Sequence, residues 1–235
     1  MRPRNAKRPT RENKVMRQIG LMIAAVAISL AAAGPLAAQQ PDAAYPFALL
    51  PLPPAKEPPV KNCTFCHGTY GQGLATAPRL AGQRAAYLEK ELNAFRDRQR
   101  DNPLSKLYMW NAVANLHPDT ARELAQYFAQ VAPRPAADGN RGLVEQGRAL
   151  YQQGIAEANV VTCVACHGPN AEGVRDIPRL GGLSALYLKR RMEEWKLGYH
   201  PTATPMPAVT RELSEGEIEA LASYLSFLGD QTASQ

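Results

Sequence analysis

The feature that most constrains this chain is a five-residue motif, Cys-x-x-Cys-His, that occurs twice with a spacing of 100 residues. The first copy is CTFCH, residues 63–67, and the second is CVACH, residues 163–167, and a glycine follows each. The chain has 235 residues and four cysteines, so the two motifs contain every cysteine present. Any fold for this sequence must place two thiols and one imidazole together at two separate points.

The sequence around the motifs repeats with the same spacing. PRLAGQRAAYL at 78–88 matches PRLGGLSALYL at 178–188, and after a three-residue slip Met109 aligns with Met206. Such self-similarity indicates two copies of one structural unit. They are joined near residues 132–142, which are rich in proline, glycine and polar residues.

The apolar residues of each unit have a helical spacing. They recur at steps of three and four residues in 85–95 and again in 185–195. Ser214 and Glu217 form a capping-box pattern, and Pro118 has the place of the first residue of a helix. No segment shows the alternating pattern that is typical of strands. The sequence therefore predicts an all-α fold.

The N-terminus has the pattern of a secretory signal peptide. Residues 1–18 carry seven basic side chains and one acidic one, and the uncharged run IGLMIAAVAISLAAA follows at 19–33. We expect Sec-type export to the periplasm with cleavage near Ala38. A retained membrane anchor is the alternative, since residues 19–38 are just long enough to span a bilayer. Removing residues 1–38 leaves equal numbers of basic and acidic residues, so the net charge of +6 does not indicate a nucleic-acid partner.

Seven prolines between residues 41 and 60 exclude an α-helix there and favour a polyproline-like conformation over 51–60. The second unit opens instead with a helical pattern over 141–154. The predicted order along the chain is a signal peptide at 1–38, a proline-rich extension at 39–60, a first domain at 61–133, a linker at 134–140 and a second domain at 141–235.

Each motif matches the attachment pattern of c-type haem. Two thiols in this spacing can form thioethers with the two vinyl groups of one haem, and the adjacent imidazole can bind its iron. A thioredoxin-like pair would need a βαβ setting, and a zinc site would bring both cysteine pairs together. Disulfides are expected after export, but they do not require a histidine after each pair. The sequence therefore predicts two covalently bound haem c groups, attached at Cys63, Cys66, Cys163 and Cys166.

The second axial ligand of each iron decides between an electron carrier and a catalyst. The candidates in the exported chain are Met109, Met192, Met206, His117 and His200. Only Met109 and Met206 occupy matching positions in the two units, whereas core packing or a helix cap explains Met192 and His117, and His200 has no counterpart. A histidine–methionine pair closes both axial positions and raises the potential of the iron.

These motifs resemble those of the cytochrome c4 family, which are dihaem class I cytochromes c. The resemblance covers about residues 60–230. It implies two tandem haem-enclosing helical domains related by approximate twofold symmetry, although prolines replace the helix that normally begins the family's first domain. It also implies that His67 and His167 are the proximal ligands and that Met109 and Met206 are the distal ones. The carbonyls of Pro78 and Pro178 would accept the N–H of the proximal imidazoles, while turn formation alone is the other explanation for these prolines.

The family further implies an electron carrier and not an enzyme. Its partners would be membrane respiratory complexes bound by transient docking: a donor of the quinol–cytochrome c reductase type and a terminal oxidase or reductase. Peripheral membrane association is compatible with this role. One alternative is an electron-transfer subunit of a membrane dehydrogenase. Another is a dihaem enzyme such as a thiosulfate-oxidising cytochrome or a peroxidase, but an enzyme needs an open or replaceable axial position, which two matched methionines do not favour.

Overall fold

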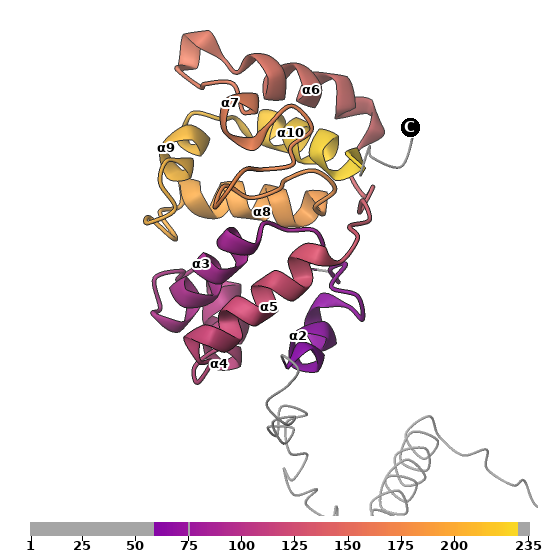
Figure 1. Cartoon of the computed structure of the whole chain (residues 1–235). Coiled ribbons are helices and arrows are strands. Elements are labelled where there is room, and N and C mark those ends of the chain that lie inside the picture. The colour runs from indigo at the N-terminus through magenta and orange to yellow at the C-terminus, as the bar shows by residue number, and fades with distance from the viewer. Residues whose placement is uncertain (1–58, 75, 230–235) are drawn as a thin grey trace, which may run out of the picture. The chain divides into compact units, whose positions relative to one another are not determined.

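The computed structural model describes residues 59–74 and 76–229, in which helices joined by turns and loops make up the regular secondary structure (Figure 1). These residues contain three isolated β-bridges and no sheet, which confirms the all-α prediction. The predicted signal peptide lies outside them, as does the polyproline-like stretch up to residue 58. The domain boundaries given above stay a prediction.

The first repeat, defined here as residues 59–133, is built around two packed helices, α3 and α5. Leu88, Leu124, Ala125 and Phe128 are its buried apolar cluster, and Cys63 packs against them. The helical segments of this repeat are α2 (Val60–His67), α3 (Ala85–Arg96), the π-helix η1 (Ser105–Met109), α4 (Trp110–Ala112) and α5 (Pro118–Gln130).

The second repeat, residues 141–229, has a larger core between α6, α8 and α10. Helix α6 crosses α10 at Gly147, where an added Cβ would clash with the carbonyl of Ala220, so only glycine permits this close approach. The predicted helix at 141–154 is confirmed as η2 followed by α6. The segments are η2 (Arg141–Leu143), α6 (Val144–Gln153), η3 (Ala156–Ala158), α7 (Val164–His167), α8 (Ala185–Lys196), α9 (Met206–Arg211) and α10 (Glu215–Phe227).

Helix starts agree with the sequence signals. Ser214 and Glu217 form the expected capping box at α10, in which each side chain accepts a hydrogen bond from the other residue's backbone N–H. Pro118 is the first residue of α5. Helix α8 has a second cap that the sequence did not indicate, because Asp138 accepts hydrogen bonds from Ala185 N (2.8 Å) and Ser184 Oγ (2.7 Å).

The two Pro-Arg-Leu motifs face each other where the repeats meet. The Arg79 guanidinium donates to the carbonyls of Gly181 (2.6 Å) and Gly182 (2.9 Å), and Arg179 Nε donates to the carbonyl of Gly82 (3.1 Å). Equivalent residues thus contact each other reciprocally, as two units related by approximate twofold symmetry would. No helix among the described residues is long and apolar enough to cross a membrane.

Candidate haem sites

Both motifs end a short helix at the histidine. His67 is the last residue of α2 and His167 is the last residue of α7. The glycines that follow have φ values of 83° at Gly68 and 81° at Gly168, a backbone conformation that side chains other than hydrogen strongly disfavour. The invariant glycine of the repeated motif is therefore explained by the turn that directs the chain away after the imidazole.

Each imidazole is buried and held by one backbone carbonyl. His67 Nδ1 lies 2.7 Å from the carbonyl oxygen of Pro78, and His167 Nδ1 lies 2.9 Å from that of Pro178. A carbonyl only accepts, so Nδ1 carries the proton and donates, and Nε2 keeps its lone pair. Burial lowers the pKa of both histidines, which favours the neutral ring. This is the form in which histidine binds a metal ion.

The four cysteines form no disulfide in the described part of the chain. Burial raises the pKa of Cys63 and of Cys163 to about 11, so that both thiols stay protonated at neutral pH. A thiol of this kind is a poor candidate for thiol–disulfide chemistry, which proceeds through the thiolate. The thioredoxin-like alternative thus receives no support from the environment of the sulfur atoms.

A cavity of about 470 Å³ brings together all of the site residues predicted in the second repeat. Apolar side chains, among them Leu180, Val209 and Leu221, form much of its remaining wall. The indole Nε1 of Trp195, another lining residue, is buried without a hydrogen-bond partner among the described residues. An apolar macrocycle with acidic groups at its edge fits such a cavity. The predicted residues on the wall are Cys163, Cys166, His167, Pro178 and Met206.

Helix α6 fixes the second motif from behind. Tyr151, which is fully buried, donates from its hydroxyl to the carbonyl of Gly168 (2.6 Å), and its own carbonyl accepts from Cys163 N (3.0 Å). In the first repeat, Cys63 of the motif packs against the α3–α5 core.

In the first repeat Met109 is half-buried and is the last residue of η1. Trp110 follows it and donates from Nε1 to the carbonyl of Arg100 (2.9 Å), and the cationic groups of Arg98 and Lys106 lie 5.5 Å and 5.7 Å from the centre of its ring. A π-helical turn is uncommon and is found often at functional sites. The sequence singled out Met109 but did not predict this local structure.

Of the other candidate ligands, Met192 and His200 also line the cavity of the second repeat, whereas His117 does not. His117 caps α5 by accepting from Asp119 N, and Met192 is buried in the core of the second repeat. His200 is buried and accepts from Arg191 through Nδ1 (3.1 Å). Sequence reasoning missed that His200 belongs to a buried polar cluster with Arg191 and Glu194. The charged residues on the helix that carries the apolar stripe of 185–195 did not indicate this cluster, because charged side chains of a helix are usually exposed.

Comparisons with known proteins agree with this geometry. The family model for cytochrome c matches residues 144–228. The chain is 35% identical to a thiosulfate dehydrogenase electron acceptor of Stutzerimonas stutzeri, over 76% of this chain and 84% of that protein. It is 32% identical to a cytochrome c4 of Pseudomonas aeruginosa, over 71% and 83%. A solved structure of cytochrome c4 from Acidithiobacillus ferrooxidans superposes with a TM-score of 0.68 at 30% identity, covering 72% of this chain and 99% of that one.

Proposed function

Because the chain belongs to the cytochrome c4 family and carries two covalently bound haem c groups, we propose that it is a periplasmic electron carrier and not an enzyme. The observation that carries this proposal is the duplicated site. In each repeat a buried neutral imidazole ends the Cys-x-x-Cys-His helix with its Nε2 unprotonated, and a methionine occupies a matching later position. This matched pair of sites favours the same role, electron exchange, for both haems.

Residues of the chain would hold each haem as follows. Cys63 and Cys66 would attach the first haem and Cys163 and Cys166 the second, while His67 with Met109 and His167 with Met206 would hold the two irons. Bound in this way, a haem supplies one-electron exchange. A histidine and a methionine on each iron would exclude small ligands and water from it. The carbonyls of Pro78 and Pro178 hold the Nδ1 proton and keep each ring in the ligating tautomer.

In this proposal the protein accepts electrons from a donor of the quinol–cytochrome c reductase type and passes them to a terminal oxidase or reductase. It docks transiently on each of these partners. The predicted N-terminal signal peptide supports a periplasmic location for this electron transfer. The similarity to an electron acceptor of thiosulfate dehydrogenase favours a second candidate, in which the donor is such a dehydrogenase and the chain is again the carrier. Stopped-flow reduction of the oxidised protein by each purified donor distinguishes these two routes.

Adding carbon monoxide to the reduced holoprotein distinguishes an electron carrier from an enzyme with an open haem iron. We expect no carbon monoxide binding at neutral pH, because methionine sulfur occupies the sixth position of both irons. The oxidised protein should show the long-wavelength methionine-to-ferric-iron band with the intensity of two such centres. Ready binding at one haem, together with half of that band, would contradict the proposal and indicate a catalytic haem.

A further inference from the structure

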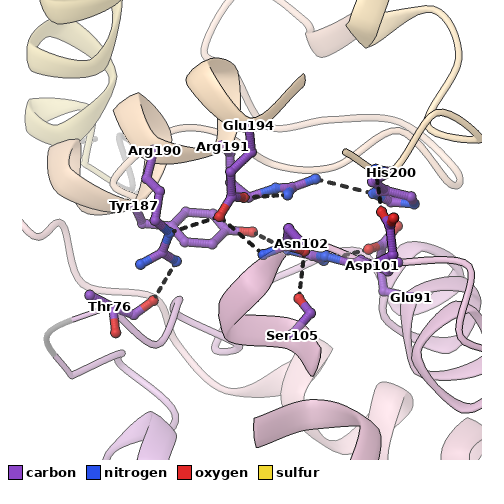
Figure 2. Close-up of polar contacts among 11 residues, drawn as sticks. Thr76, Glu91, Asp101, Asn102, Ser105, Tyr187, Arg190, Arg191, Glu194 and His200 are labelled. Atoms are coloured by element: carbon purple, nitrogen blue, oxygen red, sulfur yellow. Dashed lines mark hydrogen bonds and ion pairs between the residues drawn. The ribbon is translucent and has the colours of Figure 1, made fainter. Parts of the chain in front are cut away.

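Buried polar side chains connect the segment before Met109 with the segment before Met206. The interface network, as we name it, consists of Asn102, Ser105, Arg191, Glu194 and His200 (Figure 2). Each of these residues is at most 6% exposed. Asn102 and Ser105 lead into η1, whose last residue is Met109, and His200 stands six residues before Met206. Helix α8 lies between the two segments and supplies the remaining members.

The hydrogen bonds of the network run through one carboxylate. In the first repeat Ser105 Oγ donates to Asn102 Oδ1 (2.6 Å), and Asn102 Nδ2 donates to Glu194 Oε1 (3.1 Å). In the second repeat Arg191 donates to Glu194 Oε2 (2.6 Å) and, through its other amino group, to His200 Nδ1 (3.1 Å). Glu194 therefore contacts both repeats: Oε1 accepts from Asn102 of the first and lies 3.5 Å from Arg190 Nε of the second, while Oε2 accepts from Arg191 of the second.

Backbone groups attach the network to both methionine segments. The carbonyl of Asn102 accepts from Lys106 N (3.0 Å) in the first turn of η1. His200 N donates to Asp101 Oδ1 (2.8 Å), so the two segments also contact each other directly. A displacement of one segment would have to break or stretch these bonds.

A second connection to helix α8 runs through Trp110, the residue that follows Met109. Trp110, the next residue, donates to the carbonyl of Arg100, and the Arg100 guanidinium donates to the hydroxyl of Tyr187 on α8 (3.1 Å) while pairing with Glu91. Arg100 is 5% exposed. Met109 is thus held between two points that are both tied to helix α8 of the other repeat.

We propose that Asn102 and His200 are positioning residues that act across the repeats. Through the network, Asn102 of the first repeat holds the Met206 segment in place, and His200 of the second repeat holds the Met109 segment. Each repeat thereby sets the position of the other repeat's axial methionine, and hence the midpoint potential of the other haem. This rests on the proposed ligation by Met109 and Met206. A buried network whose hydrogen bonds are all formed has few alternative arrangements, and axial ligation tunes the haem potential. Any coupling carried in this way is reciprocal, because it is a free energy shared by the two sites.

The test uses substitutions that leave the charge unchanged at neutral pH, Asn102→Ala and His200→Asn, in the holoprotein. Asparagine suits position 200 because φ there is 52°, a left-handed value that asparagine tolerates. Redox titration resolves both midpoints. We expect Asn102→Ala to change the electron-exchange equilibrium between the haems by severalfold and to shift the second-repeat midpoint as well. His200→Asn should shift the first-repeat midpoint, and the double variant should show less than the sum of the two effects.

Asn111→Ala is the matched control, because Asn111 is exposed and lies two residues from Met109 but outside the network. It should move neither midpoint. If Asn102→Ala does not fold, Ser105→Ala removes a single hydroxyl from the same chain of bonds and tests the same effect. Shifts confined to the haem of the substituted repeat, or no shifts at all, would overturn the inference.

Failure of this inference is distinguishable from failure of the ligand assignment. If Met109 or Met206 is not an axial ligand, the unsubstituted protein lacks the methionine-to-iron band of that centre. If only the coupling is wrong, that band is present at full intensity while the effects across the repeats are absent.

Discussion

At the scale of single residues, two methionines on the wall of one cavity allow a direct test of the site. Met206 and Met192 both line the cavity of the second repeat, but Met192 packs within α8 in the buried core. We expect Met206→Leu to remove about half of the methionine-to-iron band, to lower one midpoint and to let one reduced haem bind carbon monoxide. Met192→Leu, of similar volume, should leave all three properties unchanged and cost less than about 1.5 kcal/mol of stability. Equal spectra for the two variants would contradict the assignment.

The burial of His200 leads us to expect that the stability of the protein depends on pH. Burial, with further contributions from the cations Arg100 and Arg191, lowers the pKa of His200 to about 4, from an ordinary value near 6.5. The unfolded chain therefore binds more protons than the folded one between these values. The contribution of His200 is complete above about pH 6.5 and is lost as the pH falls through 4. It amounts to about 3 kcal/mol at most.

Denaturant unfolding at a series of pH values measures this effect. The difference in unfolding free energy between the unsubstituted protein and His200→Asn should change across the window from pH 6.5 to 4 and be constant above it. A difference that is independent of pH in that window would show that His200 titrates normally. Carboxylates that titrate at low pH are common to both proteins and cancel in the comparison.

At the scale of secondary-structure elements, the caps of two equivalent helices differ. Helix α8 begins with Ser184 and the carboxylate of Asp138, whereas Arg84 at the start of α3 has no side-chain cap. We expect Asp138→Ala to destabilise the second repeat by about 1 kcal/mol, since a helix N-terminus loses a charged acceptor. Arg84→Ser should stabilise the first repeat by about 0.5–1 kcal/mol, because residue 84 already has the extended backbone of a cap. Thermal unfolding, followed by haem absorbance and by circular dichroism, measures both changes in stability. If the two substitutions changed stability in the same direction, the argument would be contradicted.

Elements that local sequence patterns specify were predictable, and those that depend on distant partners were not. The capping box at Ser214, the start of α5 at Pro118 and the apolar faces of 85–95 and 185–195 followed from spacing alone. The π-helix before Met109 did not, because KLYMWNAV carries no pattern that distinguishes it from an α-helix. Its shape coincides with tertiary contacts, such as the bond from Trp110 to Arg100.

The residues of the candidate haem sites and of the interface network show the same difference between local patterns and distant partners. The cysteines, the histidines and the paired methionines were found from motif spacing and from the internal repeat. Glu194 and Arg191 were missed because charged residues on a helix are usually at the surface. Here they are buried, and the partner Asn102 that satisfies Glu194 lies 92 residues away in the sequence. Periodicity reports which face is apolar and contains no information on such a pairing.

At the scale of the whole molecule, the twofold relation between the repeats is only approximate, and equivalent residues make different contacts in the two repeats. Arg79 and Arg179 are equivalent in sequence. Arg79 is 5% exposed and donates to three carbonyls, those of Arg134, Gly181 and Gly182, while the side chain of Arg179 is half-buried and donates to the carbonyl of Gly82. Of the two equivalent arginines, Arg79 therefore makes more side-chain hydrogen bonds to residues outside its own repeat than Arg179 does.

Substituting each arginine with alanine tests this asymmetry. We expect Arg79→Ala to lower the free energy of unfolding by about 3 kcal/mol, since three hydrogen bonds from a charged donor are lost. The carbonyl of Gly181 then loses its partner, whereas that of Gly182 still accepts from Ala136 N. Arg179→Ala, the matched control, should cost about 1 kcal/mol. Because the lost bonds join the repeats, Arg79→Ala should also separate a single unfolding transition into two, with the second repeat, which has the larger core, unfolding last. Equal losses for the two variants, or a single unshifted transition in Arg79→Ala, would show that apolar contacts and the interface network hold the repeats together without this residue.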